Sequence, residues 1–142
     1  MDKTVRDITT PILIVDDSAQ YTTVLRKVLE GGFGYRDVTT VSSATDAYDL
    51  ISENPERFRI LFVDYSLQSG TTGGQLLERL QNENLITDKV AFLITSDPTV
   101  ENMKQAKAAG ALAVVAKPFD REELKTQLDK ADRLIKSSDP WS

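Results

Sequence analysis

The stretch Arg59-Ile-Leu-Phe-Val-Asp64 decides the fold of this chain. Its apolar run is continuous, which is typical of a strand buried on both faces of a parallel sheet. The run ends on a carboxylate, and open parallel sheets build their ligand sites at the carboxyl ends of the strands. Because Asp is also a common turn residue, one acid after one strand proves little. Whether Asp64 belongs to a site depends on what the other strands place beside it.

Composition narrows the chemistry that this chain can perform. Its 142 residues are the length of one ordinary domain, and it carries a net charge of −5, which argues against direct binding of nucleic acid. It contains no cysteine and no histidine. That excludes disulfides, thiolate catalysis, histidine-based triads and zinc sites of the His/Cys type. Any bound metal must be held by oxygen ligands, which favours Mg²⁺.

Membrane insertion and secretion are not expected. No apolar run approaches the roughly 20 residues needed to span a bilayer. Residues 1–7 are polar and charged, and no apolar signal-peptide region follows them. The sequence therefore predicts a soluble cytoplasmic protein.

Four further runs have the length and composition of strands, and each is followed by a segment of helical periodicity. These strands are predicted at 12–15, 38–41, 90–94 and 113–116. The helix predicted over 98–109 has few large apolar residues and should be the least firmly anchored. In the first helical segment, apolar residues recur at intervals of three and four, at Tyr21, Val24, Leu25, Val28 and Leu29.

Local signals place the helix ends. Ser43 is predicted to cap the second helix, Asp97 before Pro98 the fourth, and Asp120 the last. The glycines at 31, 32 and 34 are predicted to end the first helix.

Five strands alternating with five helices predict an α/β fold with a (βα)5 doubly wound, five-stranded parallel sheet. The expected strand order is the flavodoxin-like 2-1-3-4-5. One domain is expected over residues 11–136. Residues 1–10 are predicted to be a loose polar lead-in, and residues 137–142 a tail.

The strand ends bring a distinctive set of side chains to one edge, since all strands of a parallel sheet run the same way. The second strand contributes only Ser42. The other strands contribute Asp16, Asp17, Asp64, Thr95, Ser96 and Lys117.

This set favours phosphoryl transfer to Asp64. Three neighbouring acids repel one another, and a bound Mg²⁺ would relieve the repulsion and offset charge on a phosphoryl group. Lys117 adds a second positive charge, and Thr95 adds a hydroxyl donor. Carboxylates are established nucleophiles in phosphoryl transfer, with an acyl phosphate as the product.

Individually, these residues have plainer interpretations. Asp16 and Asp17 could cap a helix, and Thr95 could do the same after its strand. Lys117 alone would be taken for a solvated surface residue. The glycine-rich run 70–74 lacks the lysine of a nucleotide-binding loop and is interpreted as a turn. The joint placement at the strand ends favours the site.

The chain resembles a response-regulator receiver domain of two-component signalling from about Pro11 to Ile135. The motifs that carry the resemblance stand in order at the predicted strand ends. They are Ile12-Leu-Ile-Val-Asp-Asp17, Leu61-Phe-Val-Asp64, Leu93-Ile-Thr-Ser96, Ala109-Gly-Ala111 and Lys117-Pro-Phe119.

The resemblance implies a role for each site residue. Asp64 would be the phosphoacceptor, with Thr95 and Lys117 contacting the phosphoryl group. Asp17, Asp64 and the backbone carbonyl of Ser66 would hold Mg²⁺, with Asp16 acting through a bound water. It also implies a cis peptide bond between Lys117 and Pro118.

Three features depart from the family pattern. Val114 stands where receivers usually carry Tyr or Phe, so the usual inward swing of an aromatic ring behind Thr95 is not possible. Gln68 stands where a proline is common, and the loop before Gly73 is about one residue longer than usual. Ser66 and Asp97 occupy positions that, by the resemblance, tune the lifetime of the phosphoryl group.

The leading functional hypothesis is a stand-alone receiver, not an enzyme, that accepts phosphate from a histidine kinase or phosphotransfer domain. The kinase would dock beside Asp17, near Ala19, Gln20 and Thr23. Output would use a downstream protein bound to the face of the fourth helix, fifth strand and fifth helix.

Two alternatives remain open. A degenerate receiver would bind partners without phosphorylation; the complete acid set argues against it, and Val114 keeps it open. A phosphatase with an aspartyl nucleophile would carry a second acid at the position of Ser66, and the serine argues against that reading.

Overall fold

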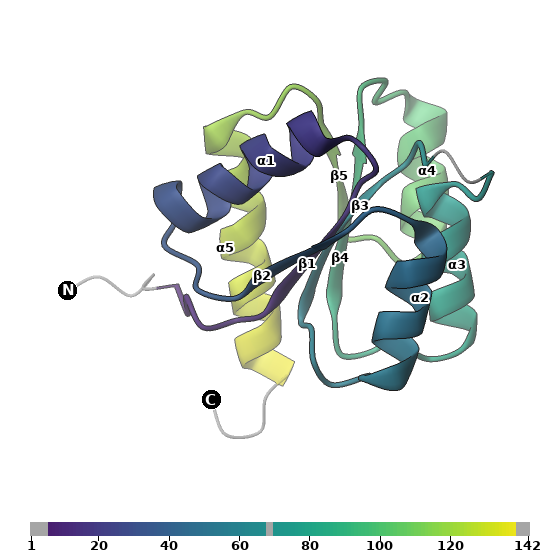
Figure 1. Cartoon of the computed structure of the whole chain (residues 1–142), viewed down its shortest axis with the longest axis horizontal. Helices are drawn as coiled ribbons and strands as arrows, with labels where there is room; N and C mark the ends of the chain where they lie inside the picture. Colours follow the sequence, from purple (N-terminus) through teal and green to yellow (C-terminus); the bar gives the residue numbers. More distant parts are fainter. Residues whose placement is uncertain (1–5, 68–69, 139–142) are drawn as a thin grey trace.

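A five-stranded parallel sheet lies at the centre of the computed structural model, which describes residues 6–67 and 70–138 (Figure 1). The sheet order is β2-β1-β3-β4-β5, which confirms the predicted α/β topology. The predicted strands at 59–63 and 90–94 each end one residue later than expected. The strands are β1 (Ile12–Val15), β2 (Val38–Val41), β3 (Ile60–Asp64), β4 (Val90–Thr95) and β5 (Ala113–Ala116).

Helices cover both faces of the sheet, with α1 and α5 on one side and α2, α3 and α4 on the other (Figure 1). This is the arrangement that right-handed crossovers produce in a doubly wound sheet. The helices are α1 (Ala19–Lys27), α2 (Ala44–Glu53), α3 (Gly73–Asn82), α4 (Val100–Ala108) and α5 (Arg121–Ser138), with a π-helical segment η1 (Val28–Gly32) directly after α1.

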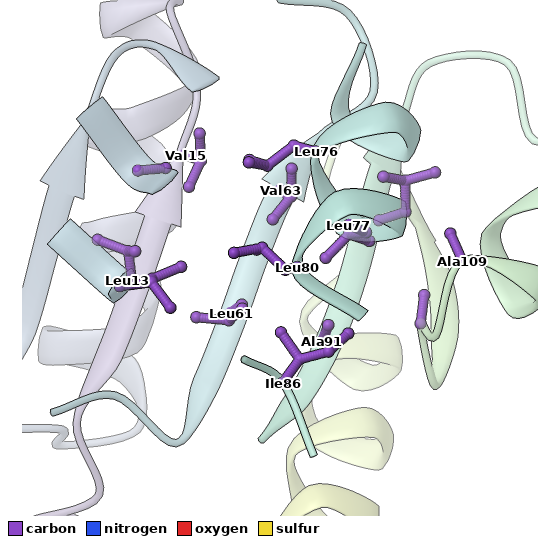
Figure 2. Close-up of a cluster of buried hydrophobic side chains, with 14 of the residues drawn as sticks. Leu13, Val15, Leu61, Val63, Leu76, Leu77, Leu80, Ile86, Ala91 and Ala109 are labelled. Carbon is purple, nitrogen blue, oxygen red and sulfur yellow. The ribbon is translucent and has the colours of Figure 1, made fainter. Parts of the chain in front are cut away.

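Two apolar cores result, one on each face of the sheet, because alternate residues of a strand point to opposite faces. Leu13 and Leu61 face the core under α2, α3 and α4, together with the α3 leucines (Figure 2). Ile14 and Phe62 face the other core, under α1 and α5, where the Phe62 and Phe92 rings stack 5.1 Å apart. Strands buried on both faces explain the continuous apolar runs in the sequence.

Strand register aligns the ends that carry the predicted site. Val15 at the end of β1 pairs with Val63, directly before Asp64 on β3. Asp64 pairs with Ile94, directly before Thr95 on β4. The functional side chains therefore lie at one edge because the strands are in register.

The cap predictions fared unequally. The Ser43 hydroxyl accepts from the Asp46 backbone N–H at 3.0 Å, which confirms the predicted cap of α2. The prediction that Asp97 caps α4 is wrong, since α4 begins at Val100 and the Thr99 hydroxyl accepts from the Asn102 N–H at 3.1 Å. The predicted start of this helix, at Pro98, is two residues too early, because proline is favoured at the first position of a helix.

The end of the first helical segment also differs from its prediction. The glycines at 31 and 32 lie inside η1 instead of ending the helix. The chain leaves the helical conformation at Gly34, whose φ of +82° is readily adopted only by glycine.

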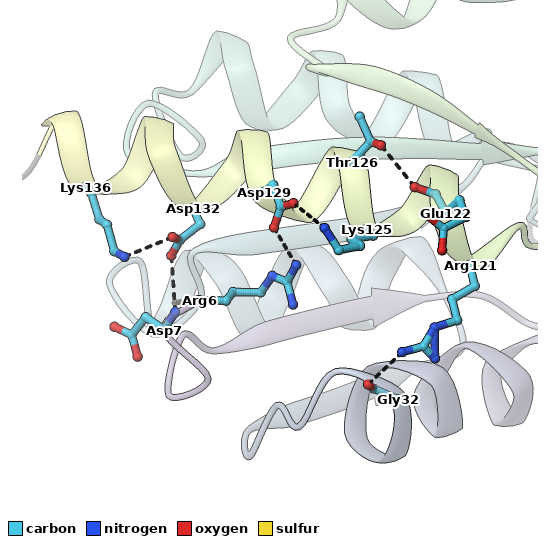
Figure 3. Close-up of polar contacts among 10 residues, drawn as sticks. All are labelled: Arg6, Asp7, Gly32, Arg121, Glu122, Lys125, Thr126, Asp129, Asp132 and Lys136. Atoms are coloured by element: carbon cyan, nitrogen blue, oxygen red, sulfur yellow. Dashed lines mark hydrogen bonds and ion pairs between the residues drawn. The ribbon is translucent and has the colours of Figure 1, made fainter. Parts of the chain in front are cut away.

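Two residues of the predicted lead-in, Arg6 and Asp7, contact the rest of the fold. Arg6 forms an ion pair with Asp129 on α5, and the Asp7 backbone N–H donates to Asp132 at 3.3 Å (Figure 3). The guanidinium of Arg6 also lies over the Phe33 ring, 5.0 Å from its centroid. Arg6 and Asp7 therefore contact α5, which extends to Ser138. The predicted domain bounds of 11–136 stay a prediction.

By burial, α4 is the most exposed helix among the described residues, because like α1 it has one buried residue but it has only one half-buried residue where α1 has two. Of its nine residues only Ala106 is buried, whereas Val100 is 70% exposed and Met103 is 45% exposed. This agrees with the prediction from its sparse apolar content. Among the described residues, no helix is long and apolar enough to cross a membrane.

Candidate functional site

Three carboxylates meet at the ends of β1 and β3, as predicted. Asp16, Asp17 and Asp64 each place a carboxylate oxygen within 4.8 Å of the others. Asp16 and Asp64 are only 4% and 5% exposed, whereas Asp17 is half-buried. A buried pair of acids with a third at the solvent side is an arrangement that requires a compensating positive charge.

Lys117 supplies such a charge from the end of β5. Its Nζ donates to Asp64 Oδ2 at 2.7 Å and lies 3.3 Å from Asp16 Oδ2. The Lys117 side chain is 7% exposed, so the ammonium group is itself largely removed from water. The Lys117–Pro118 peptide bond is cis, as predicted.

Burial and neighbouring charges shift the proton affinities of two of these groups. Burial, reinforced by the neighbouring Asp64 carboxylate, raises the pKa of Asp16 to about 6, despite a hydrogen bond from the Ser18 N–H that lowers it. Burial would lower the pKa of the Lys117 ammonium, but its hydrogen bond to Asp64 outweighs this and the net pKa is raised. The lysine therefore stays positively charged beside the acids.

The same local turn fixes a site side chain at each of three strand ends. Asp16 Oδ1 accepts from the Ser18 N–H at 2.8 Å, and Asp64 Oδ1 from the Ser66 N–H at 3.1 Å. Thr95 Oγ1 likewise accepts from the Asp97 N–H at 3.1 Å. Side-chain bonds to the backbone two residues onward are typical of Asp and Thr in turns. They orient the three groups while leaving the O–H donor of Thr95 unused by this bond.

The acid cluster fits a hard divalent cation. Its oxygen donors are the type that Mg²⁺ prefers, and the three acids together with the Lys117 ammonium leave a net charge of −2 that matches the charge of the ion. Asp16, Asp17 and Asp64 would hold the ion. For Ser66, the described contact is the backbone N–H to Asp64, and its side chain is exposed; the predicted ligand role of its carbonyl stays a prediction.

Gly73 is required where the loop after β3 returns to the site. A Cβ at this position would lie 2.1 Å from the Asp64 backbone oxygen and 2.9 Å from a Val63 methyl carbon. The Gly73 N–H donates to the Tyr65 carbonyl at 2.8 Å, which draws the start of α3 against the end of β3. Gln68, where the family proline is missing, lies outside the described residues.

Of the residues predicted to govern switching, Ser66 contacts Asp64 through its backbone N–H, whereas Val114 and Asp97 lie around the site. Val114 is half-buried and packs on the side of the sheet covered by α3 and α4, as does Tyr65. Asp97 is exposed in the loop before α4. No described contact brings either residue to Asp64, so their tuning roles stay predictions.

Sequence reasoning missed one neighbour of the site. The Tyr21 ring, from the first turn of α1, lies with its centroid 4.0 Å from Lys117 Nζ. It also meets the Phe119 ring edge-to-face, with centroids 6.2 Å apart. Periodicity had marked Tyr21 only as part of the apolar face of the helix. Its place four residues after Asp17, at the same sheet edge, is the signal that could have identified it.

The fold and the site together define a class: a doubly wound α/β domain whose strand ends carry an acidic, lysine-bridged site. Comparison with known families agrees, since the family model for the response regulator receiver domain matches residues 12–129. The chain belongs to this family, the receiver domains of two-component signalling.

Individual relatives are distant in sequence and close in structure. The chain is 25% identical over 118 residues to a chemotaxis protein CheY homolog from Campylobacter jejuni, covering 83% of this chain and 88% of the relative. It is 28% identical to the phosphate regulon transcriptional regulatory protein PhoB of Pseudomonas aeruginosa, covering 82% of this chain and 49% of PhoB. Chemotaxis protein CheY4 of Vibrio cholerae superposes with a TM-score of 0.76 at 23% identity, covering 87% and 98% of the two chains.

Proposed function

We propose that this receiver domain accepts a phosphoryl group on Asp64 in a Mg²⁺-dependent reaction. The observation that carries the proposal is the pairing of Asp64 with Lys117 at 2.7 Å, inside a cluster of three acids. A carboxylate held in this way is oriented and lies next to an ammonium group that can pair with incoming phosphoryl oxygens.

The reaction follows from these placements. An Asp64 carboxylate oxygen attacks phosphorus, the bond from phosphorus to the donor breaks, and the leaving group departs with its electron pair. Lys117 then pairs with a phosphoryl oxygen, and the Thr95 hydroxyl donates to another. Bound among the acids, Mg²⁺ would supply positive charge to the phosphoryl oxygens.

The donor is proposed to be a histidine kinase or a phosphotransfer domain, whose phosphohistidine nitrogen would be the leaving group. It would reach Asp64 across the N-terminal end of α1, where Ala19, Gln20 and Thr23 are exposed. The output partner would be a protein that binds the face of α4, β5 and α5. On α4, Val100 and Met103 offer exposed apolar contacts to such a partner.

Phosphorylation is tested by incubating the protein with acetyl phosphate and Mg²⁺ and measuring intact mass. One phosphoryl group is expected on the wild type, and none on Asp64→Asn or after chelation of Mg²⁺. Asp49→Asn, on the exposed surface of α2, is the matched control and should be modified like the wild type.

A wild type that acquires no phosphoryl group, and does not respond to beryllofluoride, would contradict the proposal. Equal binding of a partner by wild type and Asp64→Ala would then favour a degenerate receiver, for which Val114 is the specific observation. Transfer from a panel of kinases, with Asp64→Ala as control, identifies the donor.

A further inference from the structure

We infer that Tyr21 is a positioning residue for Lys117: the face of the Tyr21 ring holds the Lys117 ammonium group beside Asp64. The inference rests on the proposed function, because it assigns Tyr21 a part in the same phosphoryl transfer. It goes beyond that function by adding a residue of α1 to a site otherwise built at the ends of the strands.

Geometry places the ring at the distance of a cation–π contact. Lys117 Nζ lies 4.0 Å from the Tyr21 centroid, well within the roughly 6 Å at which such contacts are favourable. Two carboxylates, from Asp16 and Asp64, occupy other directions around the same ammonium. Because the lysine side chain is only 7% exposed, the ring acts where little water competes for the charge.

The ring is itself held in place from two sides. The Tyr21 backbone N–H donates to the Ser18 hydroxyl at 3.4 Å, which fixes the first turn of α1. The Phe119 ring meets Tyr21 at an interplanar angle of 86°, an edge-to-face arrangement that aromatic pairs prefer. Phe119 lies two residues after Lys117, so the segment that carries the lysine also supports the ring.

A neutral partner for Lys117 matters because the Asp16 and Asp64 carboxylates take part in other interactions during the proposed reaction. Asp64 would become an acyl phosphate, and Asp16 would share its charge with a bound Mg²⁺. Each change weakens the hold of a carboxylate on Lys117. The π-face of Tyr21 competes for neither a metal nor a phosphoryl group, so its attraction for the ammonium persists while the acids are engaged. Tyr21 would thereby keep Lys117 at the site during transfer.

A plainer interpretation is that Tyr21 only fills space between α1 and the loop after β5. Two substitutions separate the interpretations. Tyr21→Phe keeps the π-face, whereas Tyr21→Leu keeps apolar bulk without it. Tyr48→Leu is the matched control. Tyr48, on α2, is another half-buried tyrosine in a cation–π contact, with the Arg79 guanidinium 3.6 Å from its ring centroid.

The first measurement is made on the metal-free protein by nuclear magnetic resonance. A ring over the lysine shifts the Lys117 side-chain ε-protons upfield. This shift is expected in wild type, Tyr21→Phe and Tyr48→Leu, and is expected to be lost in Tyr21→Leu. An unchanged Lys117 signal in a folded Tyr21→Leu protein would overturn the inference.

The second measurement is the rate of phosphorylation by acetyl phosphate, a small donor that avoids effects on kinase docking. Tyr21→Leu should be slower by about fivefold, the size expected for one cation–π contact, and Tyr21→Phe should stay within about twofold of wild type. A Phe variant as slow as the Leu variant, or a Leu variant as fast as wild type, refutes the positioning role. Failure of the wild type to react instead refutes the proposed function, and the resonance measurement still decides the Tyr21–Lys117 contact.

Discussion

At the scale of single residues, the buried Asp16 carboxylate is expected to lower the stability of the fold when no Mg²⁺ is bound. Its carboxylate is buried beside Asp64, and both are only partly compensated by Lys117. Asp16→Asn keeps an oxygen that can accept from the Ser18 N–H and removes one charge. The metal-free variant should therefore be more stable than wild type at pH 7, by about 1 kcal/mol.

Thermal unfolding with and without Mg²⁺ checks this expectation. Mg²⁺ should raise the Tm of wild type, because a ligand that binds only the folded state stabilises it, and should raise that of Asp16→Asn much less. Asp49→Asn should follow the wild type in both conditions. A metal-free Asp16→Asn protein that melts below wild type would contradict the account of the acid cluster.

A second residue-scale prediction concerns the two glycines that open α3. Gly73→Ala forces a Cβ to within 2.1 Å of the Asp64 backbone oxygen, so β3 and α3 must separate locally. It should destabilise the fold by about 2 kcal/mol or more and slow phosphorylation. At Gly74 the nearest atom to a Cβ is 3.6 Å away, an ordinary contact, so Gly74→Ala is the control. Equal denaturation midpoints for the two variants would disprove the argument.

Residue types at strand ends predicted Asp16, Asp17, Asp64, Thr95 and Lys117, because parallel strands deliver their ends to one edge. The contact between Tyr21 and Lys117 could not be predicted in that way. It joins a helix turn to a distant loop, and it depends on how far α1 leans over the sheet edge. Hydrophobic periodicity describes which side of a helix is buried, but it does not say which polar group an aromatic ring will meet there.

At the scale of elements, α4 and α3 are of similar length and differ in how they are held. Leu76, Leu77 and Leu80 of α3 are buried, whereas Ala106 is the one buried residue of α4. Local opening should therefore require less free energy at α4. Amide hydrogen exchange should be faster in α4 than in α3 by roughly tenfold or more.

This prediction is checked by mass spectrometry of exchanged peptides from the unphosphorylated protein. Helix α2, of ten residues with three buried positions, should behave like α3. Slower exchange in α4 than in α3 would show that burial does not control the opening of these helices. Faster exchange in α4 would show that the face proposed for output includes a helix that opens more readily than α3.

Element boundaries show what local signals can and cannot predict. Ser43 was assigned correctly because its hydroxyl and the following acid leave one favourable start for α2. The start of α4 was misassigned because Asp97, Pro98 and Thr99 form two overlapping cap signals. The structure uses Thr99, while the Asp97 N–H turns back to Thr95. The segment 97–99 can thus either begin the helix or form the turn that orients Thr95. Sequence alone does not show which of the two Asp97 takes part in.

At the scale of the whole molecule, the alternation of strands and helices was enough to predict a parallel sheet with helices on both faces. The contacts of Arg6 and Asp7 with α5 were not predicted, because they are single polar pairs across more than 100 residues of sequence. Arg6 forms an ion pair with Asp129 on α5 and lies over the Phe33 ring, and the Arg121 guanidinium also contacts this ring, 4.9 Å from its centroid. Polar residues at a chain end have no periodicity that would mark such a contact.

This anchoring predicts a pH-dependent contribution of Asp129 to stability. Burial acts to raise the pKa of Asp129, but hydrogen bonds from Arg6 and Lys125 outweigh it and lower the pKa below its ordinary value of 3.8. A carboxyl whose pKa is lowered by folding stabilises the folded state above its ordinary pKa, and that contribution is lost as the pH falls through the lowered value. Asp129→Asn should therefore melt about 2 °C below wild type at pH 7, and the gap should close below pH 3.8.

Glu30→Gln is the control, because it removes an acid from the exposed Arg26–Glu30 pair and should change the Tm very little. Circular dichroism melting curves between pH 3 and pH 7 decide the matter, and a gap that stays constant over that range would show that Asp129 stabilises the fold by packing and not by its charge.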